Sequence, residues 1–116
     1  MLLRVELATD DASRAFGLRG RATLPPGTGM LFMWDHAAPR TMTMRETAIP
    51  LDIAFVGSDG RITSIARSVP AYTIPPISGF GQYAIEAPAG TFAQIKPGYR
   101  ITCRLCGSRS LIELLD

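Results

Sequence analysis

The sequence has 116 residues, about the modal size of one domain, and its 47% hydrophobic and 19% charged residues are typical of a chain that folds around a core. Its 12 Lys and Arg against 10 Asp and Glu give a net charge of +2 without charge runs, which argues against nucleic acid and anionic lipid as partners. No stretch approaches the roughly 18 apolar residues of a membrane helix. No apolar signal region precedes Arg4, so we expect either the mature form of an exported protein or a cytoplasmic one.

The first part of the chain predicts strands with one short helix between them. Residues 2–8 alternate apolar and charged side chains, as a half-buried strand does. Residues 9–11 offer capping oxygens for a helix of two or three turns that ends near Gly17. The apolar run 30–34 indicates a buried strand. We expect that strand to break immediately afterwards.

The remaining elements are expected in this order: a break at 35–39, a weak strand at 40–46, a strand at 51–56, a turn at 57–60, its hairpin partner at 61–67, an irregular apolar loop at 68–81, and strands at 82–87 and 99–105. Many short strands and one clear helix favour an antiparallel sheet over repeated β-α-β units. We therefore predict a mainly β domain over residues 1–106, either a sandwich or jelly roll or a partly open barrel. Residues 107–116 would form a tail, frayed or folded as a short helix.

Asp52 is the most informative position, because a carboxylate lies within an otherwise apolar strand. Burial of an ionised carboxylate costs several kcal/mol unless it is paired or hydrogen-bonded, so we expect a partner. Glu86 repeats the pattern within 83–87, and Arg45 lies just upstream of Asp52. An ion pair of Arg45 with either acid is the simplest resolution. If the two acids instead faced each other in a cleft, they could act as general acid and base.

Other chemistry-bearing residues give weaker patterns. Four of the five methionines fall within 30–44, a cluster that suits Cu(I) but is more often core packing. Cys103 and Cys106 stand three apart in an expected strand, where their side chains point to opposite faces and cannot form a disulfide without a bend. His36, the single histidine, has no nucleophile pattern to complete, and the fragment 79–81 lacks the third glycine of a dinucleotide site. We expect no metal and no cofactor.

A series of segments in linear order resembles the domain-of-unknown-function family 192. The segments are Val5-Glu6-Leu7-Ala8, Arg14-Ala15-Phe16-Gly17-Leu18, Leu24 followed by Gly29-Met30-Leu31-Phe32, Ile49-Pro50-Leu51-Asp52-Ile53-Ala54-Phe55, Asp59-Gly60-Arg61-Ile62, Ile85-Glu86, Ala89-Gly90 and Ile95-Lys96-Pro97-Gly98. The resemblance covers about residues 3 to 105. It implies a compact, mainly β fold with a short helix after the first strand, and no established activity.

The resemblance also implies that many members are exported, which would place this chain in the periplasm in its mature form. Members usually carry Trp-Met-Lys-Asn-Thr where this chain has Thr43-Met44-Arg45-Glu46-Thr47. An aromatic side chain is therefore lost here, and an acid replaces an amide.

Three functions remain open at this stage. The leading one is a small exported binding domain for an unassigned small molecule or envelope component, with Arg45, Asp52, Glu86, Met44 and Tyr72 as its candidate ligand-binding residues. The second is a hydrolase of an envelope polymer that uses both acids. The third is a protein–protein interaction module with an exposed patch of Tyr72, Ile77 and Phe80. We expect a monomer or weak dimer.

Overall fold

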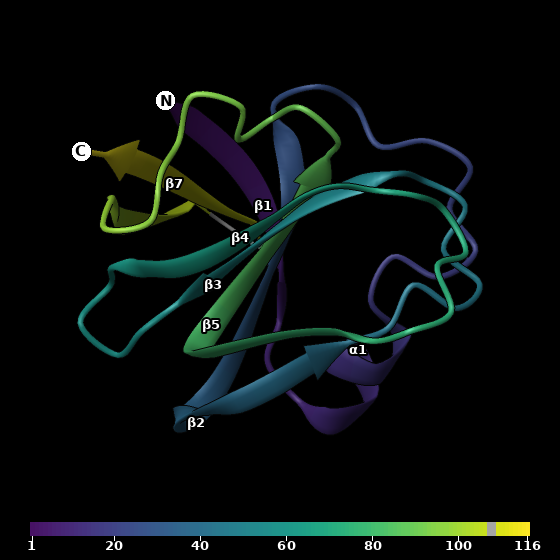
Figure 1. The fold of residues 1–116 in the computed structure, drawn as a ribbon. Helices are drawn as coiled ribbons and strands as arrows, with labels where there is room; N and C mark the ends of the chain where they lie inside the picture. The colour runs from purple at the N-terminus through teal and green to yellow at the C-terminus, as the bar shows by residue number, and fades with distance from the viewer. Residues whose placement is uncertain (107–108) are drawn as a thin grey trace.

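In a computed structural model, which describes residues 1–106 and 109–116, the chain forms a single curled sheet with one short helix (Figure 1). The elements are β1 (Leu2–Ala8), α1 (Asp11–Phe16), β2 (Thr28–Met42), β3 (Leu51–Val56), β4 (Ile62–Val69), β5 (Ile77–Pro88), β6 (Arg100–Cys106) and β7 (Arg109–Leu115). Side chains of residues 104–109 lie outside the description. The expected mainly β fold with a helix after the first strand is confirmed.

The sheet curls so far that its two edges touch at one end. Its strand order is β4-β3-β5-β2-β1-β7-β6, so β4 and β6 are the edge strands. The Ile62 amide donates to the Tyr99 carbonyl at 2.8 Å, and the Ile101 amide donates to the Gly60 carbonyl at 2.8 Å. Because these bonds join only the start of each edge strand, the sheet is a half-barrel. Of the expected architectures, the partly open barrel is the one that forms.

The helix α1 explains why one pair of strands is parallel. Asp10 caps the helix by accepting a hydrogen bond from the Ser13 amide at 2.7 Å, and Gly17 ends it with a φ of 52°. The crossover through α1 returns the chain in its original direction, so β1 and β2 pair in parallel while the other paired strands are antiparallel.

The strand β2 is longer than the sequence predicts. Residues 35–39 were expected to break it, but β2 continues to Met42 through a register shift between Met33 and Ala38. A bulge of this kind absorbs the extra residues and bends the strand without ending its pairing to β5. The expected strand at 40–46 is therefore the end of β2, and a turn follows it.

Two further expectations are wrong for the same reason, since pairing with a distant strand overrides the local pattern. β5 begins at Ile77, inside the segment expected to be an irregular loop. Gly79 permits this, because a Cβ there would lie 2.2 Å from the Phe55 ring. The C-terminal segment forms β7, which pairs with β1 and β6, rather than a helix.

Cys103 is exposed and free, and the side chain of Cys106 lies outside the described residues.

Both faces of the central strands are buried, so the sheet carries two cores. The helix-side core includes Phe32, Ile53 and Phe55, and three of the clustered methionines pack in it. The loop-side core lies on the other face and includes Val56 and Phe92. All six residues of β3 are buried, which is why a charged residue in this strand needs a partner.

Asp52 finds that partner in the backbone and not in Arg45. Its side chain is 1% exposed, and one carboxylate oxygen accepts a hydrogen bond from the Ser68 amide at 2.7 Å. The other oxygen accepts from the amides of Gly90 at 3.0 Å and Phe92 at 2.9 Å. Among the described residues, the expected ion pair between Arg45 and Asp52 is not formed.

The Ser68 amide is available because β4 bulges opposite Asp52. Leu51 pairs with Val69 and Ile53 pairs with Ala66, so two residues of β4 face the single residue between them. Ser68 itself has a φ of 50°, the left-handed conformation. Next to it, Arg67 donates to the carbonyls of Phe92 and Ile95. The turn at 89–95 is therefore held over the loop-side core by both its amides and its carbonyls.

Replacing Asp52 by Asn should lower the free energy of unfolding by about 2–4 kcal/mol, because the amide NH2 cannot accept and at least one buried N–H loses its acceptor. Urea denaturation measures the loss. The matched control is Asp59→Asn in an exposed turn, where a single side-chain oxygen accepts from the Arg61 amide. An equal loss in the two variants would show that the three buried bonds do not stabilise the fold.

Candidate functional site

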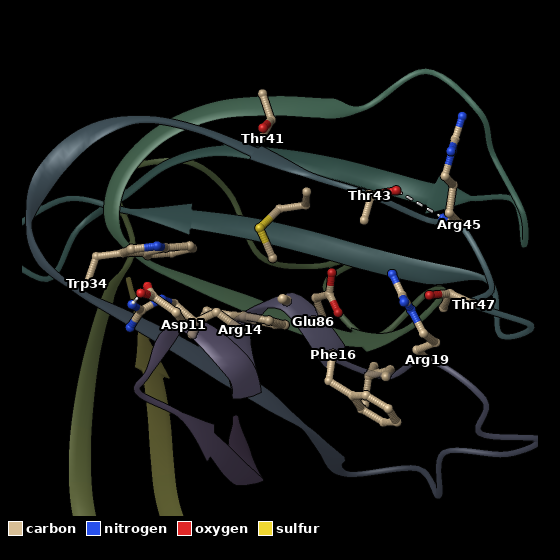
Figure 2. Close-up of a pocket in the computed structure, with 15 residues that line it drawn as sticks. Asp11, Arg14, Phe16, Arg19, Trp34, Thr41, Thr43, Arg45, Thr47 and Glu86 are labelled. Atoms are coloured by element: carbon tan, nitrogen blue, oxygen red, sulfur yellow. Dashed lines mark hydrogen bonds and ion pairs between the residues drawn. The ribbon is translucent and has the colours of Figure 1, made fainter.

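A pocket of about 310 Å3 lies between α1 and the second half of β2 (Figure 2). One wall comes from the helix and the turn after it, and the other from the end of β2 and the turn that follows. The residues lining it are Asp11, Arg14, Ala15, Phe16, Gly17, Leu18, Arg19, Phe32, Trp34, Thr41, Met42, Thr43, Arg45, Thr47 and Glu86. Figure 1 shows α1 on the side of the sheet away from the chain termini.

Glu86 supplies the only acid from the strands in this lining. The residue pairs with Met30 of β2 and Ile53 of β3, both in the helix-side core, so its side chain projects to that face. It is 4% exposed, and no hydrogen bond or ion pair joins its carboxyl to another described residue. In Figure 2 the carboxyl points into the space between the helix and the strands.

Burial raises the pKa of the Glu86 carboxyl from 4.5 to about 8. The cause is loss of hydration on burial, and no ion pair among the described residues stabilises the charged form. Near pH 7 the group is therefore mostly protonated, and the pocket holds a neutral acid that can lose a proton when a cation approaches.

Three arginines surround the same space, but they are not equally free. Arg14 donates to Asp11 at 2.8 Å and to the Met33 carbonyl at 2.7 Å. Arg19 uses its Nε to pair with Glu46 at 3.0 Å, which leaves its terminal nitrogens without a partner among the described residues. Arg45 is exposed and makes no side-chain bond within the described part of the chain. The mouth of the pocket is therefore cationic.

Trp34 forms an aromatic wall that the sequence pattern did not single out as a site residue. Its ring stacks on Phe32 with centroids 6.3 Å apart, and the Arg40 guanidinium lies 4.5 Å from the ring centroid. Arg14 lies near the same ring, at 5.8 Å. Trp34 therefore gives the pocket one aromatic wall.

The structure brings together two of the five residues predicted to bind a ligand. Arg45 and Glu86 both line the pocket. Met44 is completely buried in the helix-side core, and Tyr72 is exposed on the loop after β4, outside the pocket lining. Asp52 belongs to the opposite face of the sheet, where the backbone satisfies it.

The hydrolase hypothesis required both acids in one cleft, and the register of the sheet contradicts it. Glu86 lies opposite Ile53 on the helix-side face, whereas Asp52 lies opposite Ala87 on the loop-side face. Directly paired residues share a face and neighbours along a strand do not. The two carboxyls are therefore separated by the sheet and cannot act as an acid and base pair.

Sequence analysis missed the residues of α1 and the turn after it as site residues, because only tertiary packing places them at the pocket. Within the sequence, Arg14 and Arg19 stand on either side of the Gly17 that ends the helix. The only local indication was the expected short helix itself. Nothing in its spacing shows that the C-terminal end of α1 lies over Phe32 and so lines a pocket.

Among the described residues, no three His, Cys, Asp or Glu side chains gather as a metal site would require. The described part of the chain also has no helix with the length and apolar character needed to span a bilayer.

Comparison with known proteins supplies a family but no activity. A comparison with curated proteins gave no match. One similar solved structure is a Sinorhizobium meliloti 1021 protein provisionally described as a transcription regulator, with 32% identity and a TM-score of 0.81 over 97% of this chain and 81% of that chain. Another is a protein of unknown function from Novosphingobium aromaticivorans DSM 12444, with 34% identity and a TM-score of 0.78 over 94% of this chain and 73% of that chain. The family model described as Uncharacterized ACR, DUF192, matches residues 1–103, so this chain belongs to the domain-of-unknown-function family 192.

Proposed function

We propose that this protein is a small-molecule-binding domain whose ligand occupies the pocket between α1 and β2. The observation that carries the proposal is Glu86, a buried carboxyl without a protein partner that faces an open space. A carboxyl that loses hydration without gaining a protein partner is destabilising, and a ligand that supplies the missing partner recovers part of that free energy. The pocket also has the composition of a binding site, since aromatic and apolar walls surround a few polar groups.

An interaction module is the second candidate, and one observation favours it. Tyr72 and Phe80 are 60% and 50% exposed, and Ile74 beside them in sequence is 74% exposed. Ile77, the third member of the expected patch, is half-buried against the helix-side core. Export of the protein supports neither function over the other and stays a prediction from the family resemblance.

Ligand binding at this pocket is testable with a matched pair of tryptophan substitutions on α1. Ala15 lines the pocket and Ala12 does not, although both are exposed on the same short helix. The wild-type chain should gain several degrees of thermal stability with at least one compound from a panel of sugars, carboxylates, inorganic phosphate, metal ions and amino acids. Ala15→Trp should abolish the gain and Ala12→Trp should preserve it. Stabilisation that survives Ala15→Trp would place the ligand elsewhere.

The same carboxyl predicts a pH dependence of stability. Because the pKa of Glu86 is about 8 in the folded chain and near the ordinary 4.5 when unfolded, the folded state holds the proton over a range where the unfolded state has lost it. The contribution of Glu86 to the free energy of unfolding is largest below pH 4.5. It falls as the pH rises from about 4.5 to 8 and does not change further above pH 8. The total loss is several kcal/mol.

Glu86→Gln removes this titration and keeps the side chain's size. Urea denaturation at pH 5, 7 and 9 should show the variant gaining stability relative to wild type as the pH rises, with most of the difference present by pH 8. A constant difference between the two proteins across this range would mean that Glu86 is ionised in the folded chain and has a partner.

A further inference from the structure

We infer that the ligand is a zwitterion of amino-acid type, with an ammonium group on Glu86 and a carboxylate on Arg19 and Arg45. This inference rests on the proposed function, since it assigns a chemical class to the same pocket. It follows from two sets of groups without a protein partner in one pocket, a carboxyl that can ionise when a cation binds and the guanidinium groups of two arginines.

The first group without a partner is the Glu86 carboxyl, which a ligand cation could contact. The charged groups that face Glu86 are Asp11 and Arg14 from α1, Arg19 from the turn after it, and Arg45 from the turn after β2. Asp11 and Arg14 pair with each other, and Arg19 pairs outside the lining, through its Nε. Figure 2 shows the Arg45 guanidinium pointing away from the acid. A ligand ammonium would be the first cation to contact this carboxyl.

The second set of groups without a partner is the guanidinium groups of Arg19 and Arg45, which a ligand anion could contact. The terminal nitrogens of Arg19 and the whole guanidinium of Arg45 have no partner within the described residues. Guanidinium groups bind carboxylates through paired N–H donors, so these two arginines suit a ligand carboxylate. The buried Thr47 lines the same space.

A single zwitterion pairs the ionised carboxyl and the guanidinium groups with opposite charges, whereas a simple amine leaves the arginines without an anion. A simple anion could only accept a hydrogen bond from the protonated carboxyl, an alternative that the pH dependence below distinguishes. The volume of about 310 Å3 lies at the lower end of the range of about 300–1,000 Å3 for ligand pockets, which favours a molecule the size of one amino acid. Phe32, Trp34 and Met42 form an apolar surface for its side chain.

The proposed ion pair determines the direction of a pH effect. The acid must give its proton to the solvent before it can pair with an ammonium, and burial raises its pKa to about 8. Binding of an amino acid should therefore tighten about tenfold from pH 6 to pH 7 and release close to one proton at either pH. A ligand that instead accepts a hydrogen bond from the neutral acid would bind equally well at these two pH values and more weakly above pH 8.

Isothermal titration calorimetry of the full chain tests the assignment with the twenty L-amino acids as probes. For the tightest binder, the deaminated and decarboxylated analogues are then titrated; for L-phenylalanine these are 3-phenylpropanoate and 2-phenylethylamine. We expect each analogue to bind at least tenfold more weakly than the amino acid. Heats measured in buffers of different ionisation enthalpy should show the proton release.

Variants of the chain separate the two ends of the ligand. Glu86→Gln should weaken the amino acid at least tenfold, remove its pH dependence and leave 3-phenylpropanoate unaffected. Arg19→Gln and Arg45→Gln should each weaken the amino acid and leave its pH dependence in place. Arg100→Gln, on an exposed part of β6, is the control and should change neither.

The outcomes also distinguish this inference from the proposed function. If 3-phenylpropanoate or inorganic phosphate binds in a manner blocked by Ala15→Trp while no amino acid binds, the pocket is a binding site and the zwitterion is wrong. If amino acids bind with an affinity that does not change between pH 6 and pH 7, the ammonium does not sit on Glu86. If no compound of either panel binds, both proposals fail.

Discussion

The hydrogen bonds to Asp52 are the constraint on which the arrangement of the sheet depends. β3 is buried on both faces, and a carboxylate in such a strand is tolerated only where donors surround it. The donors come from two segments far apart in sequence, the bulge of β4 and the turn at 89–95. Once Asp52 binds them, the turn covers the loop-side core and the register of β4 against β3 is fixed. The helix-side face of the sheet is then free to form a pocket.

Glu86 presents the same physical problem on the adjacent strand and has the opposite solution. Asp52 has three backbone donors, whereas Glu86 has apolar neighbours and a raised pKa. The chain could have supplied a cation, because Arg19 and Arg45 both line the same pocket. Arg19 pairs instead with Glu46, a residue with a φ of 59° in the turn after β2. This ion pair occupies the Nε of Arg19, and no ion pair joins Arg19 to Glu86 among the described residues.

The features that could be predicted from sequence are those set by local patterns. The strand at 2–8, the strand at 51–56 and the capped helix follow from alternation and capping, and each formed where expected. β7 could not be identified because its leucines fit a helix as well as a strand, and only pairing with β1 decides between them. The site residues likewise fall into those that local sequence indicates and those that it does not. Arg45 and Glu86 could be proposed as a polar group among apolar strands, while Trp34 and the arginines of α1 required the tertiary contact between helix and sheet.

Strand register decides which chemistry the two acids can support. Side chains alternate with a period of two, so a shift of one residue between β3 and β5 would place Asp52 opposite Glu86 on the same face. The pair would then resemble an acid and base site. In the observed register Ile53 occupies that place, and the bulge at Ser68 together with the turn amides holds Asp52 on the other side. The backbone bonds that satisfy Asp52 therefore also keep its carboxylate away from Glu86, which faces the pocket without a protein partner among the described residues.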